Sequence, residues 1–299
     1  MASQIVDAPT LVQVDPEQFR ASYNRRPFTF EHQLNDHPLM QLGALVDLAN
    51  RLPSDQVMHC RGKAPIETDF DDALRHRKHG FTLDEVLRDM QHADAYVLLS
   101  HVESDPLYDK LLHTALDDIR RLSEPVDPGM CEEAAFIFIA SPGAVTPYHM
   151  DREMNFLCQV RGTKLVQLWD QGDLSILAPH EIDLLFARPD LPKPGWKPEY
   201  ASKAMKFTLG PGTGVHQPLL APHAVQNGDE LSIAIALTFR SAACRRRILI
   251  HQANYELRRL GISTAAYAAS PIVDSIKHSA YRGYLGARSL ARSVHRQRQ

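Results

Sequence analysis

The feature that most constrains this chain is a run of short β-type segments that begins near Glu133 and ends at Phe239. Apolar and β-branched residues gather in each segment, and turns containing glycine or proline separate the segments. The expected strands occupy residues 135–140, 145–151, 156–160, 164–169, 205–209, 219–225 and 231–239. Many short strands joined by such turns predict an antiparallel barrel or jelly roll, with a double-stranded β-helix core.

A glycine-rich stretch at 210–214 has the composition of a phosphate-binding loop. An apolar strand pattern follows it, where a phosphate loop would be followed by a helix. The helix N-terminus that binds the phosphate anion is therefore missing from the pattern. We expect a tight turn at this place.

Helices and two further strands are expected before the β run. Thr82 and Glu85 have the spacing of a capping box and predict the start of a helix. The N-terminal segment reads as an irregular arm, followed by helices at 39–49, 83–90 and 106–122 and strands at 57–65 and 95–100. We predict three regions: N-terminal helical and strand additions that pack on the barrel (1–130), the catalytic core (131–243), and a C-terminal basic helical segment (244–299).

The core is interrupted by a stretch rich in proline and acidic residues, at 170–202, with a short helix expected at 180–186. Trp169 and Trp196 lie near its two ends. Because this stretch leaves the strand pattern and returns to it, we interpret it as a lid-like insertion over the mouth of the barrel.

Composition is that of an ordinary soluble globular protein, since 44% of the 299 residues are hydrophobic and 23% are charged. The formal net charge of −3 gives no general electrostatic reason to expect nucleic acid binding. The four cysteines contain no Cys-x-x-Cys pair, so we expect neither a disulfide framework nor structural zinc. No apolar run is long enough for a signal peptide or a membrane span, which predicts a cytoplasmic protein.

Candidate metal ligands lie in the expected strand 145–151. His149 and Asp151 are two residues apart, and side chains of an extended strand alternate faces, so both project to one side and can share a metal. A third ligand is needed, and His223 in a later strand offers it. His216 competes for that role, but we expect it in the turn before the strand. Two histidines and one carboxylate with open positions are the ligand set of non-haem Fe(II) oxygenases.

The alternative for these residues involves no metal. His149 and Asp151 would then be a hydrogen-bonded polar pair at the rim of the barrel, and His223 a satisfied strand histidine. Lys164 opens a strand that is otherwise largely apolar. A lysine deep in a barrel needs an anion beside it, because an unpaired buried charge is costly. Otherwise it is a strand-end lysine whose ammonium reaches water. Phe136 and Phe138 face one way and line either a pocket or the ordinary core.

A family resemblance rests on three motifs. Thr146-Pro147-Tyr148-His149-Met150-Asp151 is followed by Asn155-Phe156 and then by Gly162-Thr163-Lys164. This order and spacing resemble the core of the Jumonji-C and cupin-like Fe(II)- and 2-oxoglutarate-dependent oxygenases, and are most similar to the asparaginyl hydroxylase of hypoxia-inducible factor. The resemblance covers about residues 133–240 and is absent from the tail.

The resemblance implies that His149, Asp151 and His223 bind Fe(II). It implies that Lys164 and Thr146 hold the distal carboxylate of the co-substrate 2-oxoglutarate, with Asn155 close to the co-substrate. Tyr96 corresponds only by topology to a tyrosine that assists the same carboxylate. Turn-forming or capping roles for Thr146 and Asn155, and a packed aromatic role for Tyr96, are the alternatives. Several related families place an arginine about ten residues after the second histidine, but this chain has Ile233 and Ala234 there, which favours Lys164.

The implied activity is hydroxylation of an unactivated C–H bond, coupled to decarboxylation of 2-oxoglutarate to succinate. The resemblance favours a protein or peptide side chain as substrate. A small-molecule hydroxylase acting on an amino acid or a biosynthetic intermediate is the first alternative. A non-catalytic binding or regulatory module is the second. A deep narrow pocket would favour a small molecule, and an open groove a peptide.

The C-terminal segment is basic. Arg245-Arg246-Arg247 begins an expected helix that runs to about Leu260, a further helix starts near Pro271, and no acidic residue follows Asp274. We expect either a solvated helical tail or a helix pair that forms a homodimer, as in the resembling hydroxylase. Binding of nucleic acid or of an anionic membrane surface is the less favoured interpretation of the same charges.

Overall fold

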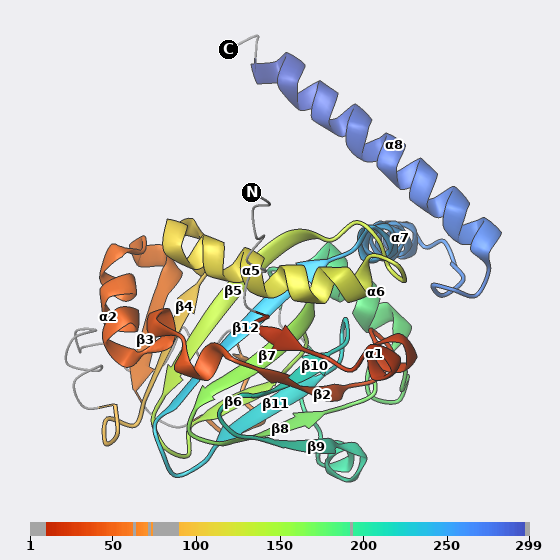
Figure 1. The fold of residues 1–299 in the computed structure, drawn as a ribbon. Coiled ribbons are helices and arrows are strands. Elements are labelled where there is room, and N and C mark those ends of the chain that lie inside the picture. The colour runs from red at the N-terminus through yellow and green to blue at the C-terminus, as the bar shows by residue number, and fades with distance from the viewer. Residues whose placement is uncertain (1–9, 62–63, 71–72, 74–89, 192–193, 297–299) are drawn as a thin grey trace. The chain divides into compact units, whose positions relative to one another are not determined.

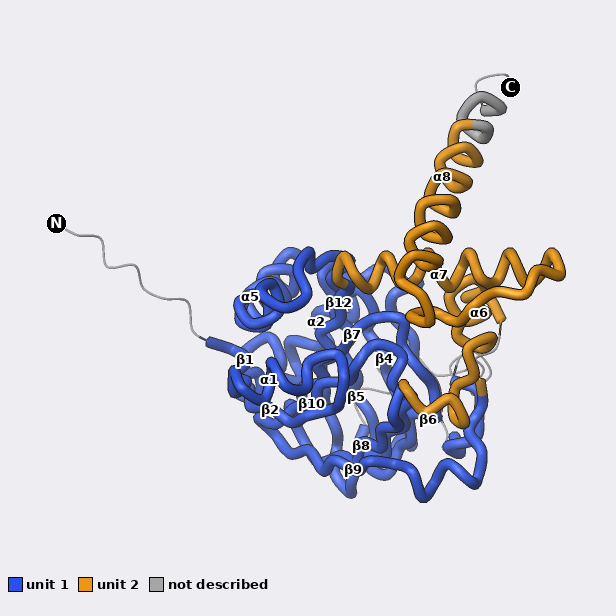
Figure 2. The backbone as a smooth tube through the Cα atoms, turned by 90° about the vertical axis from the view of Figure 1, so that its right-hand side faces the viewer, with its two compact units in different colours: residues 1–171, 195–240 blue, residues 172–194, 241–299 orange. Residues whose placement is uncertain are grey.

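The structure is a computed structural model that describes residues 10–61, 64–70, 73, 90–191 and 194–296. The helix expected at 83–90, with its capping residue Thr82, lies outside the described residues apart from Met90. The chain divides into two compact units, which Figure 2 shows in different colours. The first consists of residues 1–171 and 195–240, and the second of residues 172–194 and 241–299.

The first unit contains two antiparallel sheets. The larger sheet has eight strands, and its central strands β7, β12 and β5 lie side by side in Figure 1. In order across the sheet, the strands are β1 (Val12–Gln13), β2 (Phe28–His32), β10 (Thr213–Gln217), β7 (Met154–Arg161), β12 (Ser232–Arg240), β5 (Cys131–Ala140), β4 (Ala95–Ser100) and β3 (Val57–Arg61). Sequentially distant strands are thus neighbours, as expected for a jelly roll.

The smaller sheet has four strands in the order β6 (Val145–His149), β11 (His223–Asn227), β8 (Lys164–Leu168) and β9 (Met205–Leu209). Burial alternates along β8, so that Lys164, Val166 and Leu168 face the interior. One apolar cluster joins this interior face to that of the larger sheet, since Val166 and Val225 belong to it together with Leu157 and Ala236. The two sheets therefore face each other across one core, and the expected cupin-like jelly roll is confirmed.

Helices accompany the sheets in this unit: α1 (Pro16–Ser22), α2 (Leu42–Arg51) and α5 (Pro106–Ser123). The Asp105 carboxylate caps α5 by accepting a hydrogen bond from the Leu107 amide, 3.0 Å, and Pro106 takes the first helical position. Leucine, alanine and isoleucine residues at helical spacing form its buried stripe. The helix expected at 39–49 begins later, because Pro38 starts a separate 3₁₀ turn, Pro38–Met40, before α2.

Two of the expected strands that carry metal-ligand candidates have different limits. The strand expected at 145–151 ends at His149, and the strand expected at 219–225 is replaced by β10 and β11 with a turn between them. Pro218 and Pro222 lie in that turn and have no amide to donate to a ladder. Leu220 between them has a positive φ of 67°, which a regular strand does not accommodate.

The irregular arm expected at the N-terminus is, from residue 10 onward, partly regular structure. Its strands β1 and β2 extend the larger sheet, and β2 pairs with β10. The arm is tethered further because the Asp118 carboxylate of α5 accepts hydrogen bonds from the amides of Leu11 and Val12, at 2.7 and 3.1 Å. A two-residue strand such as β1 carries too little pattern to be recognised before its partner is known.

The second unit contains α6 (Pro179–Ala187), α7 (Ala242–Arg259) and α8 (Pro271–Arg296), so residues 172–194 of the expected insertion group with the C-terminal helices. A buried carboxylate, Asp183 of α6, receives the Nδ1–H of His251 at 2.7 Å, the amide group of Asn254 at 3.3 Å and the guanidinium of Arg258 at 3.0 Å. These bonds satisfy a charge that would otherwise be costly to bury. No helix in the described part of the chain is long and apolar enough to cross a membrane.

Candidate metal centre

The three predicted ligands meet at one end of the smaller sheet. His149 is the last residue of β6 and pairs in register with His223, the first residue of β11. The two imidazole rings lie 4.1 Å apart between centroids. One oxygen of Asp151 is 3.7 Å from Nε2 of His149, and the other is 3.7 Å from Nε2 of His223. One ligand atom from each residue lies within 4.8 Å of the others.

Asp151 reaches this place for a different reason than strand alternation. The strand ends at His149, and Asp151 lies in the following loop, where its carbonyl accepts a hydrogen bond from the Leu220 amide at 3.2 Å. Its side chain is 28% exposed, whereas those of His149 and His223 are 7% and 6% exposed. The carboxylate thus forms the solvent side of the centre, and the imidazoles form its inner side.

Both imidazoles present Nε2 to the centre because Nδ1 is occupied. Nδ1–H of His149 donates to the Pro147 carbonyl at 2.8 Å, and Nδ1–H of His223 donates to the Ala221 carbonyl at 3.1 Å. A carbonyl oxygen only accepts, so the proton resides on Nδ1 and the lone pair on Nε2. This is the arrangement in which a neutral histidine ligates a metal. The donor set and its geometry therefore fit one divalent transition metal ion.

His216, the competing candidate, does not belong to the metal centre. It lies in β10 and is fully buried. Its Nε2 accepts the Asn24 amide at 3.1 Å, and its Nδ1–H donates to the Asn155 carbonyl at 3.1 Å. Both ring nitrogens are thus occupied by backbone groups, and burial lowers the pKa of the ring to about 3. His216 is a satisfied core histidine.

A cavity of about 270 Å³ opens beside the candidate metal centre and runs into the barrel. His149, Asp151 and His223 line it, and so do Phe136 and Phe138, which we had assigned either to a pocket or to the core. The predicted co-substrate residues Lys164, Thr146 and Asn155 line the same cavity. The topology therefore collects residues from β5, β6, β7, β8 and β11 around one space.

Lys164 is the unusual group in this cavity. Its residue surface is only 5% exposed. Burial lowers the pKa of its ammonium to about 7. No hydrogen bond or ion pair reaches this ammonium from any residue that the structure describes. A buried cation that lines a cavity without a protein partner is a ready binding group for an anion.

Tyr96 and Thr146 are neighbours, since their hydroxyl oxygens lie 3.4 Å apart. Thr146 lines the cavity, but Tyr96 does not belong to its wall. Tyr96 packs in a cluster with Cys60, Leu98 and Ala140, and its ring lies 6.2 Å from that of Phe138. The geometry thus places Tyr96 behind Thr146, where it can orient the threonine hydroxyl.

Asn155 joins the metal centre to the barrel. Its amide nitrogen donates to Asp151 at 3.4 Å and to Gln217 at 3.2 Å. Its amide oxygen is buried and has no hydrogen-bond partner among the described residues. An unsatisfied buried acceptor costs free energy unless a ligand or water donates to it. This oxygen therefore marks a further polar contact available to a bound molecule.

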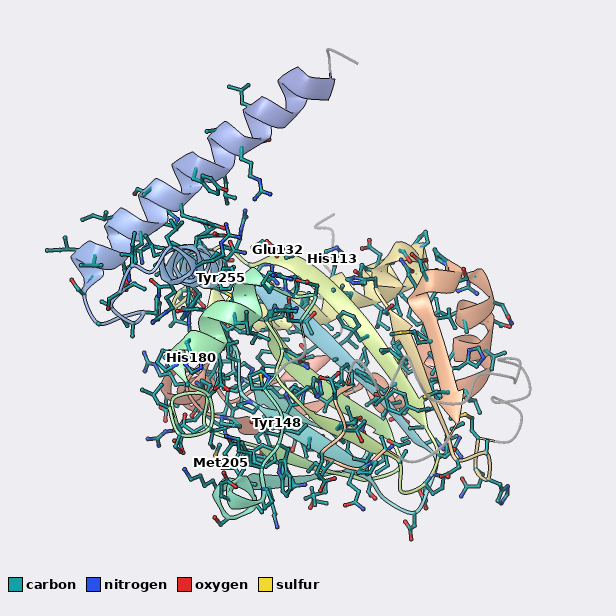
Figure 3. The ribbon with its side chains drawn as sticks, turned by 180° about the vertical axis from the view of Figure 1, so that it is seen from behind. His113, Glu132, Tyr148, His180, Met205 and Tyr255 are labelled. Atoms are coloured by element: carbon teal, nitrogen blue, oxygen red, sulfur yellow. The ribbon has the colours of Figure 1, made fainter. Side chains whose placement is uncertain are left out.

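The polar or aromatic cavity residues that were not foreseen from sequence include Phe70, Glu153 and Gln217. Gln217 belongs to β10, which we had taken for a turn, so recognition of that strand would have identified it. Burial, followed by the nearby Asp151 charge, raises the pKa of the Glu153 carboxyl. Tyr148, labelled in Figure 3, precedes His149 but does not line the cavity; its ring meets Trp169 edge-on at 5.1 Å.

Comparison with known proteins gives one family match and several structural similarities. A family model described as the cupin-like domain matches residues 16–243, which is more than half of the 299 residues. The structure is similar to that of ycfD from E. coli, with 15% identity, a TM-score of 0.48, and coverage of 88% of this chain and 62% of the other. This chain thus matches less than two thirds of the length of that protein.

A second similar structure is titled YcfD, a ribosomal oxygenase from Escherichia coli, in complex with cobalt and succinic acid. Identity is 15% and the TM-score 0.47, with coverage of 92% of this chain and 67% of the other. The complex of the same protein with cobalt and 2-oxoglutarate matches at 15% identity and a TM-score of 0.46, covering 88% and 61%. At such identities and TM-scores, these titles describe the other protein only.

Proposed function

This chain belongs to the family of proteins with a cupin-like domain, and from that premise we propose that it is an Fe(II)- and 2-oxoglutarate-dependent oxygenase that hydroxylates an unactivated C–H bond. The observation that carries the proposal is the pairing of two features in one cavity: the cluster of His149, Asp151 and His223, and the buried Lys164, whose ammonium has no partner among the described residues. The first fits iron with open positions, and the second fits an anionic co-substrate.

Each residue has a distinct role in this proposal. His149, Asp151 and His223 would hold Fe(II), which with bound 2-oxoglutarate supplies oxygen activation and the oxidative decarboxylation to succinate. The backbone carbonyls of Pro147 and Ala221 keep both imidazoles in the ligating tautomer. The Asn155 amide donates a hydrogen bond to the Asp151 carboxylate and thereby orients it.

Lys164 and Thr146 would bind the distal carboxylate of 2-oxoglutarate, with Tyr96 positioning the threonine hydroxyl. Phe136 and Phe138 line the cavity and keep water away from the co-substrate. A charge pair in such a water-poor space is stronger than on the surface. The protein thus contributes binding, orientation and water exclusion, while the metal supplies the reactive chemistry.

We propose a protein or peptide side chain as the substrate. Co-substrate and reacting group share about 270 Å³, which is just below the range of about 300–1,000 Å³ for pockets that enclose a whole drug-sized ligand. Although this cavity is not the open groove that would by itself favour a peptide, a space of this size beside the co-substrate suits one amino-acid side chain inserted from a larger molecule. A free amino acid or biosynthetic intermediate is the alternative substrate class. A non-catalytic module is disfavoured, because it would need neither the three ligands nor a buried lysine.

Measuring succinate formed from 2-oxoglutarate in the presence of Fe(II) tests the reaction class. The wild-type protein should form succinate, and Asp151→Ala should lose this turnover because two imidazoles alone leave the metal under-coordinated. Asp109→Ala, which removes an exposed carboxylate of α5, should behave as the wild type. Wild-type turnover in Asp151→Ala would overturn the metal assignment.

Mass spectrometry can separate the two substrate classes. Cell extract is divided into a peptide digest and a small-molecule fraction, and each is incubated with the protein, Fe(II) and 2-oxoglutarate. A product heavier by one oxygen atom, formed only when 2-oxoglutarate is present, should occur in the peptide fraction. Its occurrence in the small-molecule fraction alone would favour the alternative.

A further inference from the structure

Phe70 lies flat against one of the candidate metal ligands. Its ring and the His149 imidazole have centroids 4.1 Å apart and planes only 8° from parallel. Phe70 is half-buried and lines the cavity beside the ligand cluster. An aromatic side chain that contacts the candidate centre thus comes from a segment that precedes the strands of the core.

A backbone hydrogen bond holds this segment to the strand that carries His149. The amide of Tyr148 donates to the carbonyl of Ile66 at 3.0 Å. The segment that carries Phe70 and the residue next to His149 are therefore connected directly. This connection limits movement of the Phe70 ring relative to the His149 imidazole.

The two imidazoles differ in what restrains them. A hydrogen bond from Nδ1 to a backbone carbonyl orients each ring within its plane. Among the described residues, His149 has in addition an aromatic ring stacked against the face of its imidazole, and His223 does not. The one ring that contacts His223 within the described part of the chain is that of His149. A flat neighbour opposes tilting of the imidazole out of its plane and covers that face from water.

We propose that Phe70 is a positioning residue of the metal centre, whose ring holds the plane of His149 so that Nε2 stays directed at the metal. This inference rests on the proposed function in one respect, since the centre must bind a metal. Groups that orient a metal ligand without touching the metal change metal affinity about 10- to 100-fold when they are removed. Phe70 acts by packing where such groups usually act by hydrogen bonding.

Titration of the metal-free protein with Co(II) tests the inference without relying on turnover. Phe70→Leu and Phe70→Met keep an apolar side chain but lose the flat face, so the Co(II) dissociation constant should rise about tenfold or more. The visible spectrum of bound Co(II) should shift, since it reports ligand geometry. Phe70→Tyr keeps the flat ring and should restore both the wild-type affinity and the wild-type spectrum.

Phe207→Leu is the matched control, because Phe207 is a partly buried ring that packs on the barrel core from β9 and does not line the cavity. It should leave the Co(II) affinity unchanged, even where it lowers the melting temperature of the metal-free protein. Wild-type Co(II) affinity and spectrum in Phe70→Leu and Phe70→Met would overturn the role of Phe70 while leaving the proposed function intact. Failure of the wild-type protein to bind Co(II) would overturn both.

Discussion

Lys164 shows how burial can change the chemistry of one residue, here one that we propose as an anion-binding group. Its ammonium has a pKa lowered to about 7 by burial, against 10.5 for the exposed group. The folded protein therefore holds this proton more weakly than the unfolded chain does. Below about pH 7, burial of the charged Lys164 lowers the free energy of unfolding. This destabilisation should disappear as the pH rises from about 7 to 10.5.

Binding of 2-oxoglutarate should depend on the same proton. A carboxylate prefers the charged ammonium, so the dissociation constant from the Co(II) form should rise about tenfold per pH unit above the pKa of about 7. Calorimetric titrations on both sides of that pKa measure this slope. Lys164→Met should bind more weakly and lose the slope, whereas Lys206→Met, an exposed lysine of β9, should retain it. A pH-independent wild-type affinity would argue against Lys164 as the anion site.

His216 is a buried histidine that stabilises the core and takes no part in the proposed binding site. Its pKa of about 3 in the folded protein lies below the ordinary 6.5. The unfolded chain therefore binds the extra proton first, and this residue should make the free energy of unfolding fall as the pH drops from 6.5 toward 3.

Replacing His216 by Phe should destabilise the fold without affecting the metal centre. The Asn24 amide would lose its acceptor inside the protein, at a cost of about 1–3 kcal/mol. Urea unfolding across the acid range measures this loss, and the variant should show a weaker acid dependence than the wild type. Its Co(II) dissociation constant should stay unchanged. A large loss of Co(II) affinity would reinstate His216 as a ligand.

At the scale of elements, β10 matters most, because it was not recognised from sequence. It connects β2 to β7 in the larger sheet and contributes Gln217 to the cavity. Glycine is required within it at Gly214, where an added Cβ would lie 2.7 Å from the Leu157 carbonyl oxygen and even closer to the Phe30 ring. Close approach of two backbones is a recurrent reason for glycine inside a strand.

Gly214→Ala should therefore destabilise the first unit by about 1–3 kcal/mol, the usual cost of overpacking a core. Gly210→Ala, in the turn that precedes the same strand, has no atom within 4 Å of the added Cβ and serves as the control. Chemical denaturation of both variants gives the comparison. Equal midpoints for the two variants would mean that the sheet adapts to the extra methyl group.

At the scale of the whole molecule, the C-terminal helices leave apolar side chains uncovered. Ile272, Ile276 and Leu290 of α8 are 74%, 63% and 67% exposed. With about 100° per residue they fall on one face of the helix. Charged and aromatic residues, Asp274, Lys277 and Tyr281, occupy the other side, where Asp274 and Lys277 are buried. An exposed apolar stripe of this kind is typical of a protein interface, and from it we propose the homodimer through the C-terminal helices, one of the two alternatives that the sequence left open.

Ile276→Asp should disrupt that homodimer, because it places a charge within the stripe. Light scattering after size-exclusion chromatography should give the mass of a dimer for the wild type and of a monomer for the variant. Ser289→Asp adds the same charge to an exposed position that lies about 100° or more around α8 from each stripe residue, and should leave the dimer intact. A monomeric wild-type protein would disprove this oligomeric proposal.

Runs of apolar and β-branched residues bounded by turn residues predicted the fold class and most strands, because such runs express burial in a sheet regardless of which strand is the partner. The strands at 95–100 and 205–209 have the limits expected. Short or proline-flanked elements could not be located in this way: β1 is too short for a pattern, and the turn at Pro218 and Pro222 occupies the first part of the strand expected at 219–225.

The residue types and spacing of the site could also be read from the sequence, since His149, Asp151, Lys164 and His223 were all named from it. Only the tertiary structure decided that they share one cavity, because the register of β11 against β6 and β8 sets which side chains lie side by side. It also decided that His216 is occupied by backbone partners and that Phe70 covers His149. Contacts between residues far apart in the chain depend on strand pairing and packing, which local patterns do not encode.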